Sequence, residues 1–409
     1  MDLLRFATAG SVDDGKSTLI GRLLLDSKSI FEDQLEAVEA TSHSRGYDYT
    51  DLALLTDGLR SEREQGITID VAYRYFSTPR RTFILADTPG HVQYTRNMVT
   101  GASTADLAIV LVDARKGMLE QSRRHAFLAS LLRVPHLVVA VNKMDLVDWS
   151  EDAFDAVCRD FLEWASRLGL HDVAFIPVSA LEGDNVVEPS VNMPWYGGEP
   201  LLAHLEAAPA VPHVAEAPAR LPVQLVIREG ETRRYAGRLA AGTLKPGDEV
   251  VVLPAGVRTR VSAVEAPSGP RESASAPLSV SIGLEDEVDV SRGDLIAAAD
   301  AAPEPVRELA ATVCWLGDAP ARPGGRYLLK HTTRTVQARL EAIEHRIDVA
   351  TLGREPASEL ALNDLGAVRL RLGEPVMGDP YASVRSTGAF ILIDAASNET
   401  VGAGMLAGA

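Results

Sequence analysis

A run of eight residues near the N-terminus has the composition and spacing of a phosphate-binding loop. It reads G-S-V-D-D-G-K-S and matches the pattern G-x-x-x-x-G-K-[ST], between an apolar run and an amphipathic one. Glycines at both ends let the backbone curl until its N–H groups converge on a phosphate, and a helix start adds partial positive charge. The residues expected to hold a nucleotide here are Gly10, Ser11, Val12, Asp13, Asp14, Gly15, Lys16, Ser17 and Thr18.

Two side chains of this loop would carry chemistry. Lys16 is expected to reach the β- and γ-phosphates, and the Ser17 hydroxyl is expected to bind Mg²⁺. The alternative is a glycine-rich turn between strand and helix that binds nothing. The spacing, together with the patterns on both sides, favours the phosphate site.

A second polar segment, D-T-P-G-H, follows another apolar run. A carboxylate at the end of a strand beside a phosphate loop can hold Mg²⁺ through water. A glycine can bring its backbone N–H close to the γ-phosphate without strain, and the histidine would then face the attacking water. Alone, the segment could be an ordinary turn, but the phosphate loop favours the nucleotide interpretation. The expected contacts are Asp87, Thr88, Pro89, Gly90 and His91.

Two further segments predict which base is bound. The carboxylate of Asp145, in N-K-M-D, can accept two parallel hydrogen bonds from the N1–H and the amine of guanine. Adenine lacks this pair of donors, so a buried carboxylate would be left unpaired. Backbone N–H groups of S-A-L can serve the guanine O6. The base contacts are expected from Asn142, Lys143, Met144, Asp145, Ser179, Ala180 and Leu181.

Thr68 lies in G-I-T, between the phosphate loop and D-T-P-G-H. It is the candidate to close over Mg²⁺ and the γ-phosphate, which would make its loop an order–disorder switch. Alone, the charged residues 57–66 before it would be an ordinary solvated loop. The sequence therefore predicts GTP and Mg²⁺ as ligands. The expected metal ligands are Ser17, Thr68 and Asp87, and the expected catalytic residues are Lys16, Thr68, Gly90 and His91.

These segments need a sheet to position them, and the first half of the chain has that pattern. Runs rich in Ile, Val and Leu predict buried strands at residues 3–9, 82–86, 107–112, 136–141 and 173–178. Amphipathic runs predict helices at residues 16–25, 121–132 and 150–168. The alternation predicts an α/β P-loop GTPase domain with a mostly parallel sheet covered on both faces. Residues 71–76 are expected to form an antiparallel edge strand beside 82–86.

The second half has a different pattern. Four prolines interrupt an Ala-rich stretch at residues 207–222, which is expected to be a linker. Short strands with Gly, Pro and Asp turns follow, and they favour two β-barrel domains. Residues 267–277 are expected to form a surface loop. The predicted domains are residues 1–206, 223–300 and 305–409.

Composition limits the class of protein. The 409 residues are 46% hydrophobic and 24% charged, which excludes a disordered or fibrous chain. The net charge of −17 argues against binding nucleic acid or anionic membranes through bulk charge. No apolar run approaches the roughly 20 residues that cross a bilayer. Cys158 and Cys314 are far apart in sequence, which fits a reducing cytoplasm.

The five segments together resemble the elongation-factor-type GTPases. The runs E-R-E-Q-G-I-T-I-D at 62–70 and G-H-V-Q-Y-T-R-N-M-V-T-G at 90–101 extend the resemblance. The second half is similar to the second and third domains of that superfamily, at residues 244–250, 362–368, 388–394 and 400–404. The resemblance therefore covers essentially the whole chain.

One branch of the superfamily is the best match. Translation factors usually carry a histidine where Asp14 stands. The runs G-S-V-D-D-G-K-S-T-L-I-G-R-L-L, D-S-K at 26–28 and E-D-Q-L at 32–35 are similar to the large GTPase subunit of bacterial sulfate adenylyltransferase. Leu25 departs from the family, which more often has an aromatic residue or histidine there.

This resemblance implies a two-protein enzyme. A separate small subunit of the ATP pyrophosphatase type would form adenosine 5′-phosphosulfate and pyrophosphate from ATP and sulfate, in a heterodimer or higher heteromer. The chain in hand would hydrolyse GTP and couple that reaction to adenylyl transfer. The alternatives are a translation factor that delivers aminoacyl-tRNA and a specialised-metabolism paralogue that activates sulfate. Neither a membrane nor a nucleic acid is the expected partner.

Overall fold

The computed structural model describes residues 2–28, 32–44, 50–55, 71–90, 95–168, 173–209, 213–230, 232–348 and 351–408. The chain divides into two compact units, Met1–Ala210 and Val211–Ala409. Within the described ranges, no helix has the length and apolar character needed to cross a membrane.

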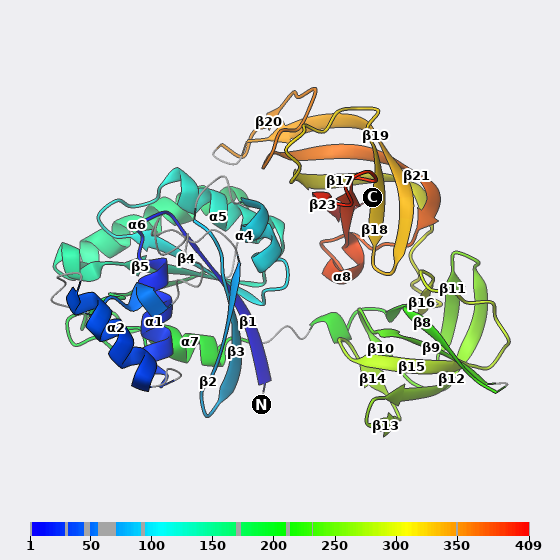
Figure 1. Cartoon of the computed structure of the whole chain (residues 1–409), viewed down its shortest axis with the longest axis horizontal. Helices are drawn as coiled ribbons and strands as arrows, with labels where there is room; N and C mark the ends of the chain where they lie inside the picture. The colour runs from blue at the N-terminus through cyan, green and yellow to red at the C-terminus, as the bar shows by residue number, and fades with distance from the viewer. Residues whose placement is uncertain are drawn as a thin grey trace. The chain divides into compact units, whose positions relative to one another are not determined.

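The first unit is built on a six-stranded sheet in the order β2-β3-β1-β4-β5-β6 (Figure 1). Its strands are β1 (Asp2–Gly10), β2 (Ala72–Ser77), β3 (Arg81–Asp87), β4 (Leu107–Asp113), β5 (His136–Asn142) and β6 (Val173–Pro177). All neighbouring strands are parallel except β2, which runs antiparallel to β3. The expected mostly parallel sheet and its antiparallel edge strand are both confirmed.

Helices cover both faces of this sheet (Figure 1). They are α1 (Lys16–Asp26), α2 (Glu32–Ser44), α4 (Thr95–Ala102), α5 (Glu120–Leu131), α6 (Glu151–Ala165) and α7 (Leu201–Ala207). Short 3₁₀ turns are η1 (Leu52–Leu55), η3 (Met144–Val147), η4 (Ser166–Leu168) and η5 (His213–Ala215), the last in the second unit. The helix expected at 150–168 is α-helical only to Ala165 and then tightens into η4.

Apolar spacing explains how α1 and α6 pack. Leu19, Ile20 and Leu23 recur at helical spacing on α1 and join the core that contains the buried side chains of β1, β3 and α7. In α6, Phe161 and Trp164 lie three residues apart on the buried face. The Ser150 side chain caps the start of α6 by accepting a hydrogen bond from the Ala153 N–H.

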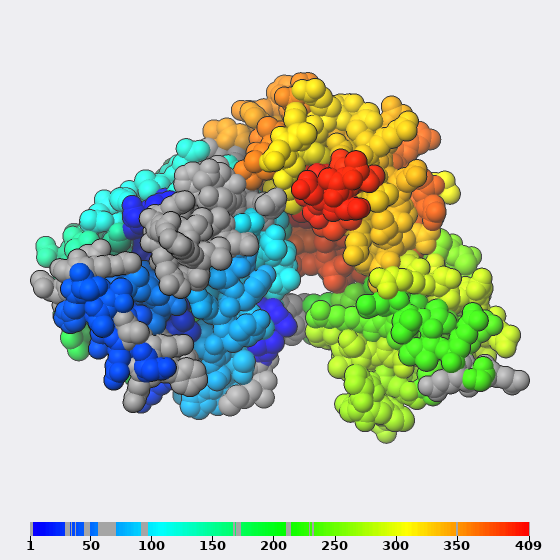
Figure 2. All heavy atoms as spheres, viewed as in Figure 1, coloured from blue at the N-terminus to red at the C-terminus, as the bar shows by residue number. Residues whose placement is uncertain are grey.

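The parallel strands bring their carboxyl ends to one edge of the sheet. Thr8 of β1 pairs with Asp87 of β3, and Asp113 of β4 pairs with Asn142 of β5. Polar residues that end different strands are therefore neighbours, which is where open α/β sheets place their ligands. At one lateral edge of the sheet, β2 lies on the surface of the unit (lighter blue in Figure 2), and Tyr75 is 70% exposed.

The second unit contains two β-domains. The first is formed by β7 (Arg220–Pro222), β8 (Leu225–Glu229), β9 (Thr232–Arg238), β10 (Thr243–Leu244), β11 (Glu249–Leu253), β12 (Val257–Ala266), β13 (Gly269–Pro270), β14 (Ala274–Ser275), β15 (Ser279–Leu284) and β16 (Leu295–Ala298). The second is formed by β17 (Val306–Trp315), β18 (Arg326–His331), β19 (Arg334–Ile347), β20 (Arg354–Glu355), β21 (Leu365–Val376), α8 (Arg385–Gly388), β22 (Ala389–Ile393) and β23 (Thr400–Leu406). Pairing of β18 with both β22 and β19 closes the second sheet into a barrel. The expected β-barrel class is confirmed.

Two stretches expected to be irregular contain strands. The expected loop at 267–277 is wrong in part, because β13 pairs with β12 and β14 pairs with β10. The expected linker at 207–222 ends in β7, which pairs with β16 and buries Leu221 completely. Strands of two or three residues have no measurable periodicity, so their pairing comes from distant partners.

A buried ion pair joins the two β-domains of this unit. Arg220 donates from Nε and Nη2 to the two carboxylate oxygens of Asp379, at 3.0 and 2.9 Å. The Thr387 hydroxyl donates to the same carboxylate at 2.6 Å. Because both charges are buried, each depends on the other for its solvation.

Candidate nucleotide site

The glycine-rich loop connects β1 to α1 with a strongly curled backbone. Asp13 and Gly15 have φ angles of 68° and 89°, in the left-handed region. A Cβ on Gly15 would collide with the Asn142 side-chain amide, so the position requires glycine. The Asp14 N–H donates to the Ser11 carbonyl at 3.3 Å and closes the turn. Such a curl at a helix start forms a concave nest of N–H groups that suits a phosphate.

Asp14 is an unusual group inside this loop, because its side chain is buried. One carboxylate oxygen accepts the Ser11 N–H at 2.8 Å. Burial raises the pKa of Asp14 to about 6, against the opposing effects of the Ser11 hydrogen bond and of the nearby Lys116 and Lys143.

This raised pKa predicts how stability depends on pH. The folded chain binds the Asp14 proton more tightly than the unfolded chain, so stability falls as pH rises from about 3.8 to about 6. The shift corresponds to a loss on the order of 3 kcal/mol. The nucleotide-free Asp14→Asn variant should therefore gain stability over wild type at pH 7.5 but not at pH 4, as measured by urea unfolding. The matched control is Asp13→Asn, at an exposed position of the same loop. An Asp14→Asn gain that is equal at both pH values would contradict the prediction.

Lys16 and Asp87 meet at the carboxyl edge of the sheet. The Lys16 ammonium contacts an Asp87 carboxylate oxygen, and both residues are buried, at 8% and 2% exposure. Lys16 begins α1, directly after β1 and its loop, and Asp87 ends β3. Because β1 pairs with β3, Lys16, which is expected to contact the phosphates, lies beside Asp87, which is expected to bind the metal. A buried ammonium and carboxylate in direct contact stabilise each other.

The D-T-P-G segment reaches the phosphate loop. A Cβ on Gly90 would collide with the Gly10 carbonyl oxygen, which shows how closely the two backbones approach. The Thr88 hydroxyl donates to the Thr8 carbonyl at 2.6 Å and fixes the start of the segment on β1. Two predicted site residues, His91 and Thr68, lie outside the described residues.

Hydrogen bonds connect the two segments expected to contact the base, residues 142–145 and 179–181, to the phosphate loop. The Asn142 amide donates to the Asp14 carbonyl at 2.7 Å, and its side-chain oxygen accepts the Ala180 N–H at 2.9 Å. The Ser179 hydroxyl donates to Asp145 Oδ1 at 2.6 Å. Lys143 contacts the Asp13 carbonyl. The structure therefore brings together the predicted phosphate, Asn142–Asp145 and Ser179–Leu181 segments.

Asp113 is a site residue that the sequence analysis missed. This fully buried carboxylate ends β4 and accepts hydrogen bonds from Arg115 Nε and Nη2, at 3.0 and 2.7 Å. Lys143 Nζ lies 3.1 Å away. Burial alone would raise the pKa of Asp113, but the hydrogen bonds from Arg115 and Lys143 lower it to about 2. Its signal was present in the sequence, because Asp113, like Asp87, directly follows an apolar run.

Helix α5 places polar side chains beside the phosphate loop. The Ser11 hydroxyl donates to the Gln121 side-chain oxygen. His125, also on α5, is buried, and burial together with the nearby Lys16 charge lowers its pKa to about 3. His125 is therefore neutral at physiological pH and adds no cation to the site.

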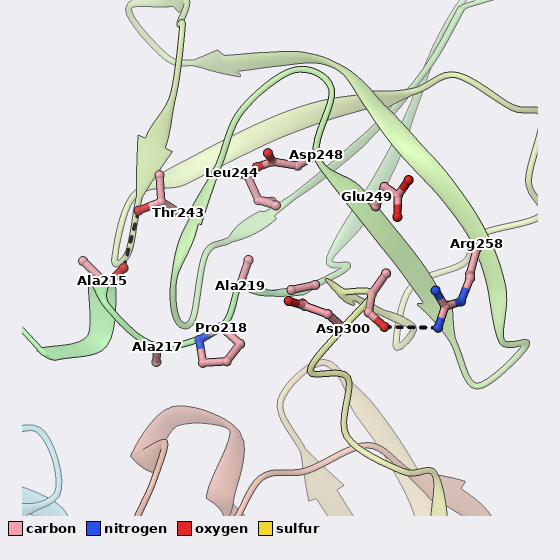
Figure 3. A pocket seen from close by; sticks show the side chains of 12 residues that line it. Ala215, Ala217, Pro218, Ala219, Thr243, Leu244, Asp248, Glu249, Arg258 and Asp300 are labelled. Carbon is pink, nitrogen blue, oxygen red and sulfur yellow. Dashed lines mark hydrogen bonds between the residues drawn. The ribbon is translucent and has the colours of Figure 1, made fainter.

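A separate hollow of about 520 Å³ lies in the second unit (Figure 3). Alanines and a proline from 215–219 form one side, and Asp248, Glu249, Arg258 and Asp300 contribute charge. The first three of these have partners within the unit: the Lys245 N–H, Arg260 and the Ala299 carbonyl. The hollow therefore offers fewer polar groups for a ligand than the carboxyl edge of the sheet in the first unit, which remains the candidate site.

Known protein families match both units of the chain. The family model described as the elongation factor Tu GTP binding domain matches residues 1–219. The model described as the GTP-eEF1A C-terminal domain-like family matches residues 308–407.

Curated relatives match nearly the whole chain. The "Bifunctional enzyme CysN/CysC" of Mycobacterium tuberculosis (strain ATCC 25618 / H37Rv) is 59% identical, over 99% of this chain and 67% of that protein. The "Sulfate adenylyltransferase subunit 1" of Tolumonas auensis is 53% identical, over 99% of this chain and 86% of that protein. Among solved structures, sup35 complexed with GDP matches with a TM-score of 0.46 and 23% identity, over 100% of this chain and 94% of that one.

Proposed function

The chain belongs to the elongation factor Tu-type GTPases and to the sulfate adenylyltransferase subunit 1 family, and we propose that it couples GTP hydrolysis to sulfate activation. It is an enzyme subunit that depends on GTP, and the name subunit 1 implies a partner subunit. The observation that best supports a GTP site is the hydrogen-bonded network joining the phosphate loop to Asn142, Asp145 and Ser179.

The phosphate part of the site fits a nucleotide triphosphate. The curled loop supplies N–H donors, and the buried Lys16 ammonium stands at its end next to Asp87. We assign Lys16 to the β- and γ-phosphates, where it would neutralise charge that builds up during transfer. Gly90, whose backbone approaches the Gly10 carbonyl, would direct its N–H to the γ-phosphate.

The same edge fits Mg²⁺. Magnesium is usually held by one or two protein oxygens together with phosphates and water. The Ser17 hydroxyl at the start of α1 and the buried Asp87 carboxylate offer such a set, and Thr68 is proposed as the third ligand. When bound, Mg²⁺ would neutralise phosphate charge. The chain's own residues would orient GTP and, through His91, place the attacking water.

The reaction of ATP with sulfate is proposed to take place on a partner subunit. We propose that a small subunit of the ATP pyrophosphatase type joins sulfate to the AMP moiety of ATP and releases pyrophosphate. This reaction is unfavourable because it forms a phosphoric–sulfuric anhydride, so coupling to GTP hydrolysis would raise the yield of adenosine 5′-phosphosulfate. We place the complex in the cytoplasm, because Cys158 and Cys314 are both free thiols.

The test is an assay of the complex made by coexpressing this chain with a small subunit of that type. Without GTP, adenosine 5′-phosphosulfate should stop accumulating at the ATP–sulfate equilibrium. With GTP it should pass that level while GTP is consumed. A non-hydrolysable GTP analogue is the control and should not raise the final level. GTP hydrolysis should also be slower in the isolated chain than in the complex during turnover, because no arginine can be assigned from the sequence as a catalytic finger, although Arg63 and Arg96 lie near Thr68 and His91 along the chain.

Two outcomes would contradict the proposal. One is a final level of adenosine 5′-phosphosulfate that is the same with and without GTP. The other is copurification of the chain with tRNA instead of a small subunit, which would favour the translation-factor alternative.

A further inference from the structure

Arg22 is a charged residue of the first unit, and the proposed GTP and Mg²⁺ contacts give it no role. It lies on α1, whose first residue is Lys16, and its side chain is 20% exposed. The guanidinium is engaged on each of its three nitrogens. Nε donates to the Ala180 carbonyl at 3.2 Å, Nη2 donates to the Leu181 carbonyl, and Nη1 lies 3.6 Å from Asp26 Oδ1. A planar guanidinium that is held through all three of its nitrogens has little freedom to rotate.

The carbonyls that Arg22 holds belong to the S-A-L segment. The Ala180 carbonyl and the Leu181 N–H are parts of one peptide unit, and in a trans peptide they point in opposite directions. Because the Ala180 carbonyl is directed at α1, the Leu181 N–H is directed away from that helix. The guanidinium thus sets the direction of a backbone donor that it does not touch.

The preceding peptide unit, between Ser179 and Ala180, is also held. The Ala180 N–H donates to Asn142, and Asn142 in turn donates to the Asp14 carbonyl in the phosphate loop. That loop leads directly into α1, so Arg22 completes a ring of hydrogen bonds that returns to its own helix. With the Ala180 N–H engaged by Asn142, the Leu181 N–H is the donor left to serve guanine O6.

We propose that Arg22 is a specificity-determining positioning residue, which directs the Leu181 N–H at guanine O6 by holding the Ala180 carbonyl. The proposal rests on the proposed GTP function. It predicts that losing Arg22 weakens one contact with the base and leaves the phosphate contacts unchanged.

The test compares GTP with 6-thioguanosine triphosphate, which differs only in having sulfur in place of O6. Sulfur accepts hydrogen bonds weakly, so wild type should prefer GTP. Replacing Arg22 with lysine or alanine should lower GTP affinity by about tenfold, the size of one well-aligned hydrogen bond. The affinity for the thio analogue should change much less. The GTP preference should therefore shrink, which equilibrium titration can measure.

Arg81→Lys is the matched control. Arg81 also donates hydrogen bonds to backbone carbonyls in this unit, those of Leu205 and Ala208, but these carbonyls lie outside residues 179–181. It should change the two affinities by the same factor.

Three outcomes can be distinguished. An equal loss of both nucleotides in the Arg22 variants would make Arg22 structural and overturn the proposal. An unchanged GTP affinity in folded Arg22→Lys and Arg22→Ala proteins would do the same. Failure of wild type to bind GTP would instead overturn the proposed function, and this inference with it.

Discussion

Replacing Asp145 with asparagine is expected to turn preference for GTP into preference for xanthosine triphosphate. Asparagine can keep an oxygen to accept the Ser179 hydroxyl, which donates to Asp145 Oδ1 at 2.6 Å, so the loop should keep its shape. Its amide would replace the second oxygen and face the guanine amine with another donor. Xanthine carries a carbonyl at that position, and the amide can donate to it.

The expected size of this change is large. A site built for particular hydrogen bonds rejects a ligand that lacks them by factors of about 10⁴. We therefore expect GTP affinity to fall by roughly four orders of magnitude, and xanthosine triphosphate to become the tighter ligand. Competition titrations with both nucleotides measure the switch.

Asp148→Asn is the matched control for this experiment. Asp148 is an exposed carboxylate at the end of the same short turn, so its replacement should leave nucleotide preference as it is. Unchanged GTP preference in the Asp145→Asn protein would remove the assignment of residues 142–145 as the base-reading segment.

The first unit could be predicted closely because its signals are local. The parallel strands carry apolar runs, such as the six residues 107–112 of β4, and β4 is buried along its whole length. The chemistry begins where such a run stops, as at Gly10 and Asp87. Burial on both faces of a parallel sheet leaves this mark in the sequence itself.

Features that depend on distant partners could not be predicted in the same way. Arg22 and Ala180 are 158 residues apart, and nothing near Arg22 indicates that its donors meet those carbonyls. Asp113 has a local signal, since it directly follows an apolar run, but its contact with Lys143 forms only when β4 and β5 pair. A strand such as β14, two residues long, is defined by its pairing with β10 and not by any repeat.

The His91→Ala variant is expected to lose hydrolysis while keeping nucleotide affinity. His91 directly follows Gly90, whose backbone lies against the Gly10 carbonyl of the phosphate loop. We therefore expect its side chain to act near the γ-phosphate, where an attacking water must be placed. A positioned catalytic group contributes about 10²- to 10⁴-fold, so single-turnover GTP hydrolysis should slow by that factor. Titration with GDP should show little change, because Lys16 and the loop amides remain.

Two companion variants separate catalysis from folding. His91→Gln introduces an amide that can hold water, so it should hydrolyse GTP faster than His91→Ala. His43→Ala removes an exposed histidine from α2 of the same unit and should match wild type. If His91→Ala lowered GDP affinity as much as hydrolysis, His91 would be supporting the shape of the site and not the attack. A loss confined to the hydrolysis step would instead place His91 beside the water, because an alanine there leaves the phosphate contacts intact and removes only the group that aligns the nucleophile.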